Sequence, residues 1–375
     1  MAEPTNGVQT ATTDSIQLIG TVLSVQANYY WVQLDPQTVS VETETASLLC
    51  TRRARLKKIG QRVIVGDRVV VEEADWVGGR GAIAQILERQ TELDRPPIAN
   101  VDQILLVFAL AEPMLDPLQL SRFLIKAEST ELAVALCLNK SDLVDAETRA
   151  DWRDRIQEWG YQPIILSLQT KMGLDFLQTQ LSQQTTVVSG PSGVGKSSLI
   201  NTLIPDVDLR TGAVSGKLGR GRHTTRHVEL FELPQGGLLA DTPGFNQPDI
   251  DCDPQELGGY FPEVRHRLTE GSCQFNDCLH RDEPNCAVRG NWERYDHYLT
   301  FLEEAIARQS ALEQLGDAES TTKTKVGAEG QVQTEPKLAT KKYRRPSRRS
   351  QRQSLQDLCQ DVESLLQSGE LDEDE

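Results

Sequence analysis

The order of three short motifs constrains the fold of this chain more than any other feature of its sequence. The motif Asn-Lys-Ser-Asp at 139–142 comes first, a glycine-rich loop at 190–197 follows about fifty residues later, and Asp-Thr-Pro-Gly at 241–244 comes last. Each motif follows an apolar run of the length and pattern of a buried strand. The sequence therefore predicts an α/β domain in which loops far apart in the chain serve one site.

The glycine-rich loop has the composition of a phosphate-binding loop. Its residues are Gly-Pro-Ser-Gly-Val-Gly-Lys-Ser, between a predicted strand at 185–189 and a predicted helix that opens at 198. Glycines allow backbone N–H groups to turn inward around phosphates at a helix N-terminus. Lys196 would then reach the β- and γ-phosphates of a nucleotide, and the Ser197 hydroxyl would bind Mg²⁺.

The other two motifs supply a metal ligand and a base reader. Asp241 ends an apolar strand and is placed to act on the same Mg²⁺, whereas Gly244 would donate its N–H to the γ-phosphate. Asp142 can accept hydrogen bonds from N1 and the exocyclic amine of guanine, a pair that adenine cannot donate. Ser167, which ends the strand at 163–166, is the predicted second base contact, with a plain helix cap as the alternative. The residues predicted to bind GTP are Asn139, Lys140, Ser141, Asp142, Ser167, Gly190, Pro191, Ser192, Gly193, Val194, Gly195, Lys196, Ser197, Ser198 and Gly244.

The base-reading motif precedes the other two, whereas in Ras-like GTPases it follows them. This order is expected if the original termini had been joined and the chain reopened elsewhere, because domain ends usually lie close together. Predicted helices alternate with predicted strands at 101–110, 132–138, 163–167, 185–189, 227–233 and 237–241. This alternation predicts a mainly parallel sheet covered on both faces. Residues 93–250 are therefore predicted to form a circularly permuted Ras-like GTPase domain.

The stretch 16–92 reads as a small β-barrel of the oligonucleotide-binding (OB) type. It contains only short apolar runs with Gly-Asp and Gly-Gly turns between them, and residues 1–15 before it are predicted to be disordered. Strands are predicted at 17–25, 29–34, 63–65, 68–72 and 82–87. The aromatic run 29–31 could stack on RNA bases, with core packing as the alternative. The basic run 52–62 could bind phosphates, or it could be a solvated surface.

Four soft metal ligands gather near the C-terminal end of the ordered sequence. Cys273, Cys278, His280 and Cys286 lie within fourteen residues, a density that predicts one closed structural Zn²⁺ site per chain. A disulfide, which a reducing compartment disfavours, and chance clustering of thiols are the alternatives. Residues 251–311 are predicted to form a small zinc-binding domain that the metal helps to hold together.

Composition limits the possible partners and location of the protein. The formal net charge of −16 argues against a protein coated in nucleic acid, although basic runs persist locally. No run of eighteen apolar residues occurs, and the N-terminal segment is polar, so neither a membrane span nor a signal peptide is expected. We expect a cytoplasmic monomer. Residues 312–375 read as a low-complexity tail with a short amphipathic helix at 354–366.

A barrel, a permuted GTPase domain and a Cys-Cys-His-Cys domain, in that order, resemble the RsgA (YjeQ) family of small ribosomal subunit biogenesis GTPases. The resemblance covers about residues 16–310, and the stretch 219–226 resembles the switch region of the family. It implies binding to the late-assembling small subunit, rRNA contacts by the barrel and the zinc domain, and GTP hydrolysis stimulated by the subunit. The alternatives are a permuted GTPase for another RNA or for large-subunit assembly, and a nucleotide-gated RNA-binding module with negligible turnover.

The switch-like sequence suggests how hydrolysis would proceed. Thr225 is the predicted switch ligand of Mg²⁺, because a threonine followed directly by arginine resembles other bacterial assembly GTPases. Phe245 stands where Ras-like enzymes use a glutamine to orient the attacking water. The intrinsic rate is therefore expected to be low. His223 is the candidate for positioning water, with a plain loop histidine as the alternative.

Overall fold

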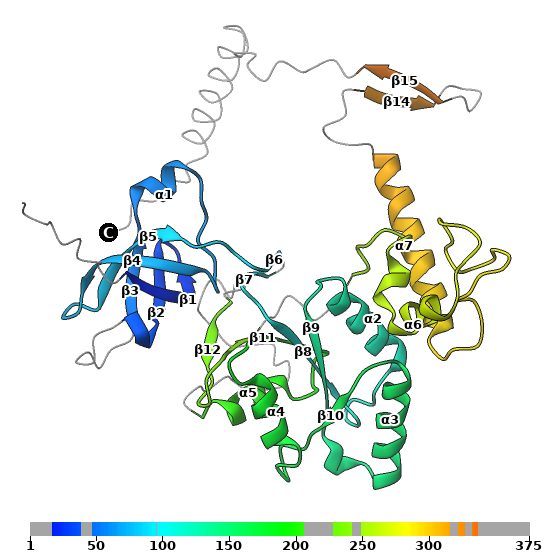
Figure 1. Ribbon diagram of the computed structural model, residues 1–375, viewed down its shortest axis with the longest axis horizontal. Coiled ribbons are helices and arrows are strands. Elements are labelled where there is room, and N and C mark those ends of the chain that lie inside the picture. Colours follow the sequence, from blue (N-terminus) through cyan, green and yellow to red (C-terminus); the bar gives the residue numbers. More distant parts are fainter. Residues whose placement is uncertain are drawn as a thin grey trace, which may run out of the picture. The chain divides into compact units, whose positions relative to one another are not determined.

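The computed structural model describes residues 17–38, 47–94, 96–205, 228–241, 249–315, 322–326 and 332–336 (Figure 1). The chain forms two compact units, residues 1–308 and 309–375. The predicted disordered segment 1–15, the predicted helix at 354–366, His223, Thr225 and Gly244 lie outside the described residues. None of the described helices is long and apolar enough to cross a membrane.

The N-terminal part is a closed five-stranded barrel, as the sequence predicts. Its strands are β1 (Leu18–Gln26), β2 (Tyr29–Leu34), β3 (Ser47–Arg52), β4 (Arg68–Asp75) and β5 (Arg80–Ile86), with a short helix α1 (Ala54–Lys58) and a 3₁₀ turn η1 (Pro36–Thr38). They close in the order β1-β2-β3-β5-β4, with only the β3–β5 pair parallel. Alternation along β2 buries Tyr30 in the barrel core and leaves Tyr29 and Trp31 52% and 43% exposed. Two of the three aromatic side chains therefore remain available on the surface.

The barrel differs from the prediction in two strands. β3 was not predicted, and the strand predicted at 63–65 is absent. The side chains of Val63, Ile64 and Val65 are buried, but the backbone there forms a turn in which the Ile64 N–H donates to the Asp67 carboxylate at 2.7 Å. The apolar pattern therefore predicted the burial of this segment correctly, but in place of a strand the segment forms a single parallel bridge between Val65 and Ile98.

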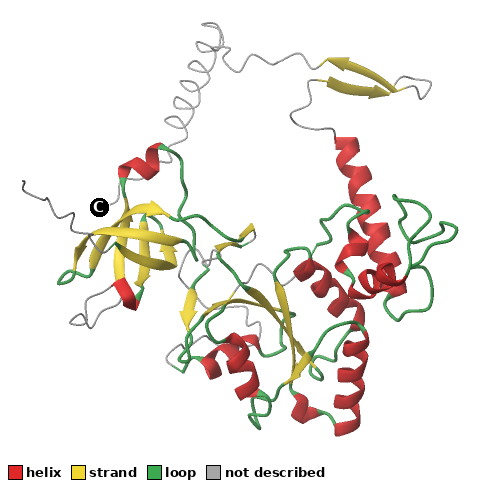
Figure 2. Ribbon diagram, in the orientation of Figure 1, coloured by secondary structure: helices red, strands yellow, loops and turns green. Residues whose placement is uncertain are grey.

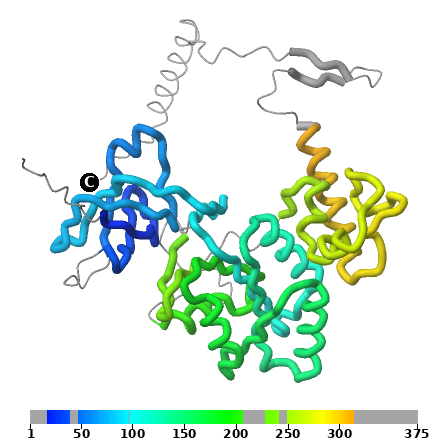
Figure 3. Tube along the Cα trace, viewed as in Figure 1, coloured from blue at the N-terminus to red at the C-terminus, as the bar shows by residue number. Residues whose placement is uncertain are grey.

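The predicted GTPase domain contains a six-stranded sheet. Its strands are β8 (Gln103–Ala109), β9 (Ala133–Asn139), β10 (Pro163–Ile165), β11 (Thr185–Ser189), β12 (Leu230–Glu232) and β13 (Leu238–Asp241). They lie in the order β10-β9-β8-β11-β13-β12, and all neighbours are parallel except β12 with β13. β8 and β11 pair side by side although they are about eighty residues apart in sequence (Figure 3). The predicted mainly parallel sheet is therefore confirmed.

Helices cover both faces of this sheet (Figure 2). Apolar side chains of α2 (Pro117–Glu128) and α3 (Ala146–Glu158) pack on one face, and those of α4 (Leu174–Leu181) and α5 (Lys196–Leu203) pack on the other. A 3₁₀ turn, η2 (Ser141–Leu143), follows β9. The core strand β8 is buried at every residue, as a parallel strand between two helical layers requires.

A small hairpin, β6 (Glu92–Asp94) with β7 (Pro97–Ala99), connects the barrel to the GTPase sheet. Beside it, Arg89 donates from Nε to the fully buried carboxylate of Asp67 at 2.7 Å. The Asn100 side chain donates to Gly66 O at 2.9 Å and accepts from the Gln90 N–H at 2.9 Å. These contacts satisfy the buried polar groups at the junction between the two parts.

The C-terminal part of the first unit packs on α2 and α3 through η4 (Leu257–Tyr260), α6 (Pro262–Glu270) and the first part of α7 (Tyr295–Leu315). Arg122 of α2 forms two hydrogen bonds to the Glu304 carboxylate at 2.6 and 2.5 Å. Arg294 is fully buried, pairs with Glu263 at 2.7 Å, and lies over the Trp159 ring at 4.9 Å. Arg294 is thus enclosed by Glu263 of α6 and by Trp159, which follows α3.

The second unit contains an antiparallel pair of strands, β14 (Thr322–Val326) and β15 (Val332–Pro336). Composition alone predicts no secondary structure in this stretch. Helix α7, which begins in the first unit at Tyr295, continues to Leu315.

Candidate functional site

The phosphate loop has the predicted strand–loop–helix geometry. Gly190 follows β11 with φ +142°, and Gly195 precedes α5 with φ +99°. A Cβ on Gly190 would lie 2.1 Å from the Val107 carbonyl oxygen, and one on Gly195 would lie 2.5 Å from Asn139 Nδ2. Only glycine fits these two close approaches. The Lys196 ammonium donates to the carbonyls of Gly190 and Pro191 at 2.7 and 2.6 Å, which curls the loop around it.

The base-reading motif contacts the phosphate loop directly, although about fifty residues separate the two in sequence. Asn139 Nδ2 donates to the Val194 carbonyl at 2.8 Å, and Lys140 Nζ donates to the Gly193 carbonyl at 2.9 Å. Asn139 is 2% exposed, and its Oδ1 is buried without a partner among the described residues. A buried acceptor beside the loop suits a ligand with donors, as a nucleotide base has.

Ser167 contacts Asp142, the residue that is predicted to read the base. The Ser167 hydroxyl donates to Asp142 Oδ1 at 2.5 Å and accepts from the Thr170 N–H at 3.1 Å. Ser167 is fully buried, and its own N–H donates to the Met172 carbonyl at 3.0 Å. The serine thus orients the carboxylate as well as capping a turn.

For the other predicted residues the structure gives either the exposure of the side chain or the pairing of the backbone. Ser197 is half-buried and Ser198 is exposed in the first turn of α5. Asp241 ends β13, where its backbone pairs with Val188 two residues before the phosphate loop. Ser192 is exposed in the loop itself.

One contact at this site has no signal in the sequence. Lys140 also donates to the carbonyl of Glu112, in the loop that follows β8. A backbone carbonyl carries no residue-type signature, so only the folded chain reveals that this loop supports the site.

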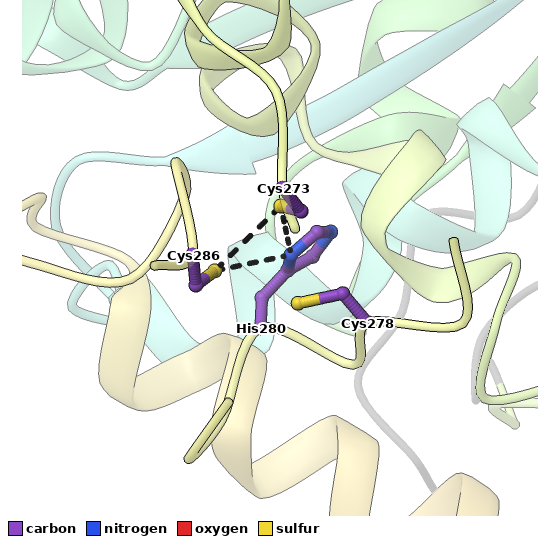
Figure 4. Close-up of side chains that lie close together, drawn as sticks. All are labelled: Cys273, Cys278, His280 and Cys286. Carbon is purple, nitrogen blue, oxygen red and sulfur yellow. Dashed lines mark hydrogen bonds between the residues drawn. The ribbon is translucent and has the colours of Figure 1, made fainter. Parts of the chain in front are cut away.

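The four predicted metal ligands converge in the loop between α6 and α7 (Figure 4). Their ligand atoms all lie within 4.8 Å of one another, and the group could hold a metal ion. His280 Nδ1 lies 3.5 Å from Cys273 Sγ and 3.4 Å from Cys286 Sγ, and these two sulfurs are 3.8 Å apart. Burial raises the pKa of the Cys278 thiol to about 12 and lowers the pKa of His280.

Three further side chains fix the metal loop, and the sequence did not identify them. The Glu283 carboxylate accepts from the N–H groups of Leu279 and Arg281, both at 2.8 Å. From α7, the Tyr295 hydroxyl donates to the His280 carbonyl at 2.9 Å and the Tyr298 hydroxyl to the Leu279 carbonyl at 2.7 Å. They hold His280 in a left-handed conformation with φ +58°.

Comparisons with known proteins agree with this geometry. The RsgA GTPase family model matches residues 86–251. A relative from Trichormus variabilis, the small ribosomal subunit biogenesis GTPase RsgA, is 64% identical over 363 residues, covering 92% of this chain and 98% of its own length.

Two solved structures share the fold at substantial identity. YloQ, described as a circularly permuted GTPase, is 32% identical with a TM-score of 0.64, covering 80% of this chain and 99% of its own. YjeQ from Thermotoga maritima is 31% identical with a TM-score of 0.64, covering 78% and 99%. Together with the permuted motif order and the closed barrel, these similarities show that the chain belongs to the RsgA GTPase family.

Proposed function

We propose that this protein hydrolyses GTP to GDP during late maturation of the small ribosomal subunit, with rRNA binding and stimulation of hydrolysis by the subunit. The observation that carries the proposal is the contact between the base-reading and phosphate loops, where Asn139 and Lys140 donate to the Val194 and Gly193 carbonyls. The name of the Trichormus variabilis relative supports the choice of subunit.

Each predicted nucleotide contact has a distinct task. Lys196 neutralises the β- and γ-phosphates, and the N–H groups around Gly193 and Gly195 donate to phosphate oxygens. Ser197, Thr225 and Asp241 would hold Mg²⁺, which supplies further neutralisation of phosphate charge when bound. Asp142, oriented by Ser167 at 2.5 Å, selects guanine.

The motifs of this chain contain no glutamine to position the attacking water, as Ras-like enzymes have. Phe245 cannot hydrogen bond to water, so the intrinsic rate is low in our proposal. His223 positions the attacking water when the subunit is bound. The predicted bounds of 16–92, 93–250 and 251–311 assign RNA contact to the first and third domains and hydrolysis to the second.

The barrel supports RNA contact through its exposed side chains. Tyr29 and Trp31 offer aromatic faces on β2, and Arg55, Lys57 and Lys58 are exposed on α1, the short helix that follows β3. Exposed aromatic faces suit stacking on bases, and exposed cations suit binding to phosphates. The proposal assigns the protein to the cytoplasm as a monomer that binds the small subunit.

Zinc fits the four-residue cluster, because three cysteines and one histidine are ligands of the kind that bind structural zinc. Tetrahedral coordination at about 2.3 Å to sulfur and 2.0–2.1 Å to nitrogen sets S···S and S···N separations of about 3.8 and 3.6 Å. The separations of 3.8, 3.5 and 3.4 Å among Cys273, Cys286 and His280 agree with this geometry. Cys278 completes the set. Four protein ligands leave no open position, so the proposed role is structural.

Cys278→Ala should abolish zinc binding and unfold the loop between α6 and α7. A structural site of this kind contributes folding free energy on the order of several kcal/mol or more. Metal analysis should find close to one zinc per wild-type chain and little in the variant, with a lower unfolding temperature. Cys252→Ala, which removes a half-buried cysteine outside the cluster, is the matched control. Wild-type protein purified without chelator but free of zinc would contradict the assignment.

The proposed function is tested by GTP hydrolysis with and without separated ribosomal subunits. Addition of small subunits should raise kcat by about 10²- to 10⁴-fold, the range for a positioned general acid–base group. Large subunits should have no such effect. Stimulation by large subunits alone would favour an assembly role there, and no stimulation by either would favour a nucleotide-gated binding module.

A further inference from the structure

Barrel strand β1 contributes to two cores. Val22 is fully buried in the barrel core, whereas Leu23, 8% exposed, belongs to the hydrophobic cluster of the GTPase sheet. The pairing of β1 with β2 slips at this point, because Val22 pairs with Val32 and Ser24 pairs with Trp31. Leu23 is thus the extra residue of a β-bulge, a device that redirects a side chain. Strand alternation turns Leu23 away from the side of Val22 and the barrel core, and the bulge keeps Ser24, which pairs with the exposed Trp31, on that same outer face.

Immediately after the bulge, β1 pairs with the GTPase sheet. Ser24 forms an antiparallel bridge with Glu229, the residue that precedes β12. Val228, 7% exposed, and Leu230, 2% exposed, flank Glu229 and belong to the same cluster as Leu23. The barrel therefore holds the start of β12 by both backbone pairing and packing.

The register of the sheet connects this bridge to the nucleotide site. Leu230 pairs with Ala240, so the same register extended by one residue places Glu229 opposite Asp241. Asp241 in turn pairs with Val188, two residues before the phosphate loop. Ser24 is consequently separated from the phosphate-loop strand by only two backbone neighbours. A close-packed core of this kind transmits a shift of one strand to the next.

We infer that Leu23 and Ser24 are positioning residues for GTP hydrolysis. Through Glu229 they fix the end of β13 that carries Asp241, so a partner bound to the barrel adjusts the geometry of hydrolysis. This inference rests on the proposed function, and it names a route by which RNA on the barrel stimulates turnover. It predicts that weakening the Leu23 contact separates subunit binding from subunit stimulation.

The test compares the same leucine-to-alanine substitution at two sites in the barrel. Leu23→Ala removes the contact to the GTPase cluster, and Leu48→Ala, at a fully buried site in the barrel core, removes packing within the barrel only. Leu23→Ala should keep the Kd for GDP and the Kd for small subunits, yet lower the stimulated kcat by about 2- to 30-fold. Leu48→Ala should keep the stimulated kcat at saturating subunit.

A rescue experiment separates positioning from folding. Ser24→Cys and Glu229→Cys introduce thiols at paired positions, where antiparallel neighbours lie within disulfide reach. Closing this disulfide in the Leu23→Ala protein should restore the stimulated kcat, and reduction should lower it again. A closed disulfide that leaves the rate low would contradict positioning by β1.

The outcomes distinguish the inference from the function on which it rests. Wild-type protein that small subunits do not stimulate would overturn both. Wild-type stimulation that Leu23→Ala retains in full, or that Leu23→Ala and Leu48→Ala lose equally, would overturn the inference alone. Val228→Ala provides the same test from the GTPase side and should match Leu23→Ala.

Discussion

Asp142→Asn should lower the affinity for GTP by about 10²- to 10⁴-fold and create affinity for xanthosine triphosphate. The carboxylate accepts two charge-assisted hydrogen bonds from guanine in our proposal, each contributing about 1.5–3 kcal/mol. An asparagine amide donates to the C2 carbonyl of xanthine, where guanine has its amine. The Ser167 hydroxyl, 2.5 Å from Asp142 Oδ1, can still donate to the asparagine carbonyl and keep the side chain oriented.

Equilibrium binding of both nucleotides measures this exchange. Asp145→Asn is the matched control, because Asp145 lies three residues away and caps α3 through the Thr148 N–H. Asparagine caps helices as well as aspartate does, so the control should bind GTP like the wild type. Full GTP preference in Asp142→Asn would remove Asp142 from the role of base reader.

His223→Ala should lower the subunit-stimulated kcat by about 10²- to 10⁴-fold while leaving the affinity for GTP nearly unchanged. The imidazole acts on water in our proposal and makes no contact with the nucleotide. Lys196→Ala should instead damage nucleotide affinity and turnover together, because it removes the cation on the phosphates. Bound to GTP, the His223 variant should remain longer on small subunits, since release follows hydrolysis in the proposed cycle.

Stimulated kcat and the Kd for GTP, measured side by side, separate these two effects. His227→Ala removes another imidazole from the same segment and is the appropriate control. An unchanged stimulated rate in His223→Ala would show that water is positioned by another group, and the subunit itself would then be the place to search.

The sequence was most informative about the candidate site where chemistry restricts the residue type. Gly190 and Gly195 were identifiable because their backbones approach Val107 and Asn139 too closely for any Cβ. The Cys and His cluster was identifiable because four soft ligands rarely gather by chance. These signals depend on the residue type itself, either a metal-binding side chain or the missing Cβ of glycine, and the residue type is read directly from the sequence.

Contacts made by ordinary residues were not predictable. Glu112 supports Lys140 with a backbone carbonyl, and any residue type could do so. Tyr295 and Tyr298 read as core residues of a helix, and only folding brings their hydroxyls to the metal loop. The bulge at Leu23 was also hidden, because alternation already turns Leu23 away from Val22 and the extra residue changes the face only of the residues that follow it.

The bridge between Ser24 and Glu229 has a further consequence for how the GTPase domain behaves by itself. β12 is the outermost strand of its sheet, and β1 covers the start of its exposed side. Uncovered strand edges recruit strands from other molecules and lead to aggregation. A GTPase domain separated from the barrel would uncover this edge beside the apolar Val228 and Leu230. We therefore expect the separated domain to aggregate more readily than the full chain.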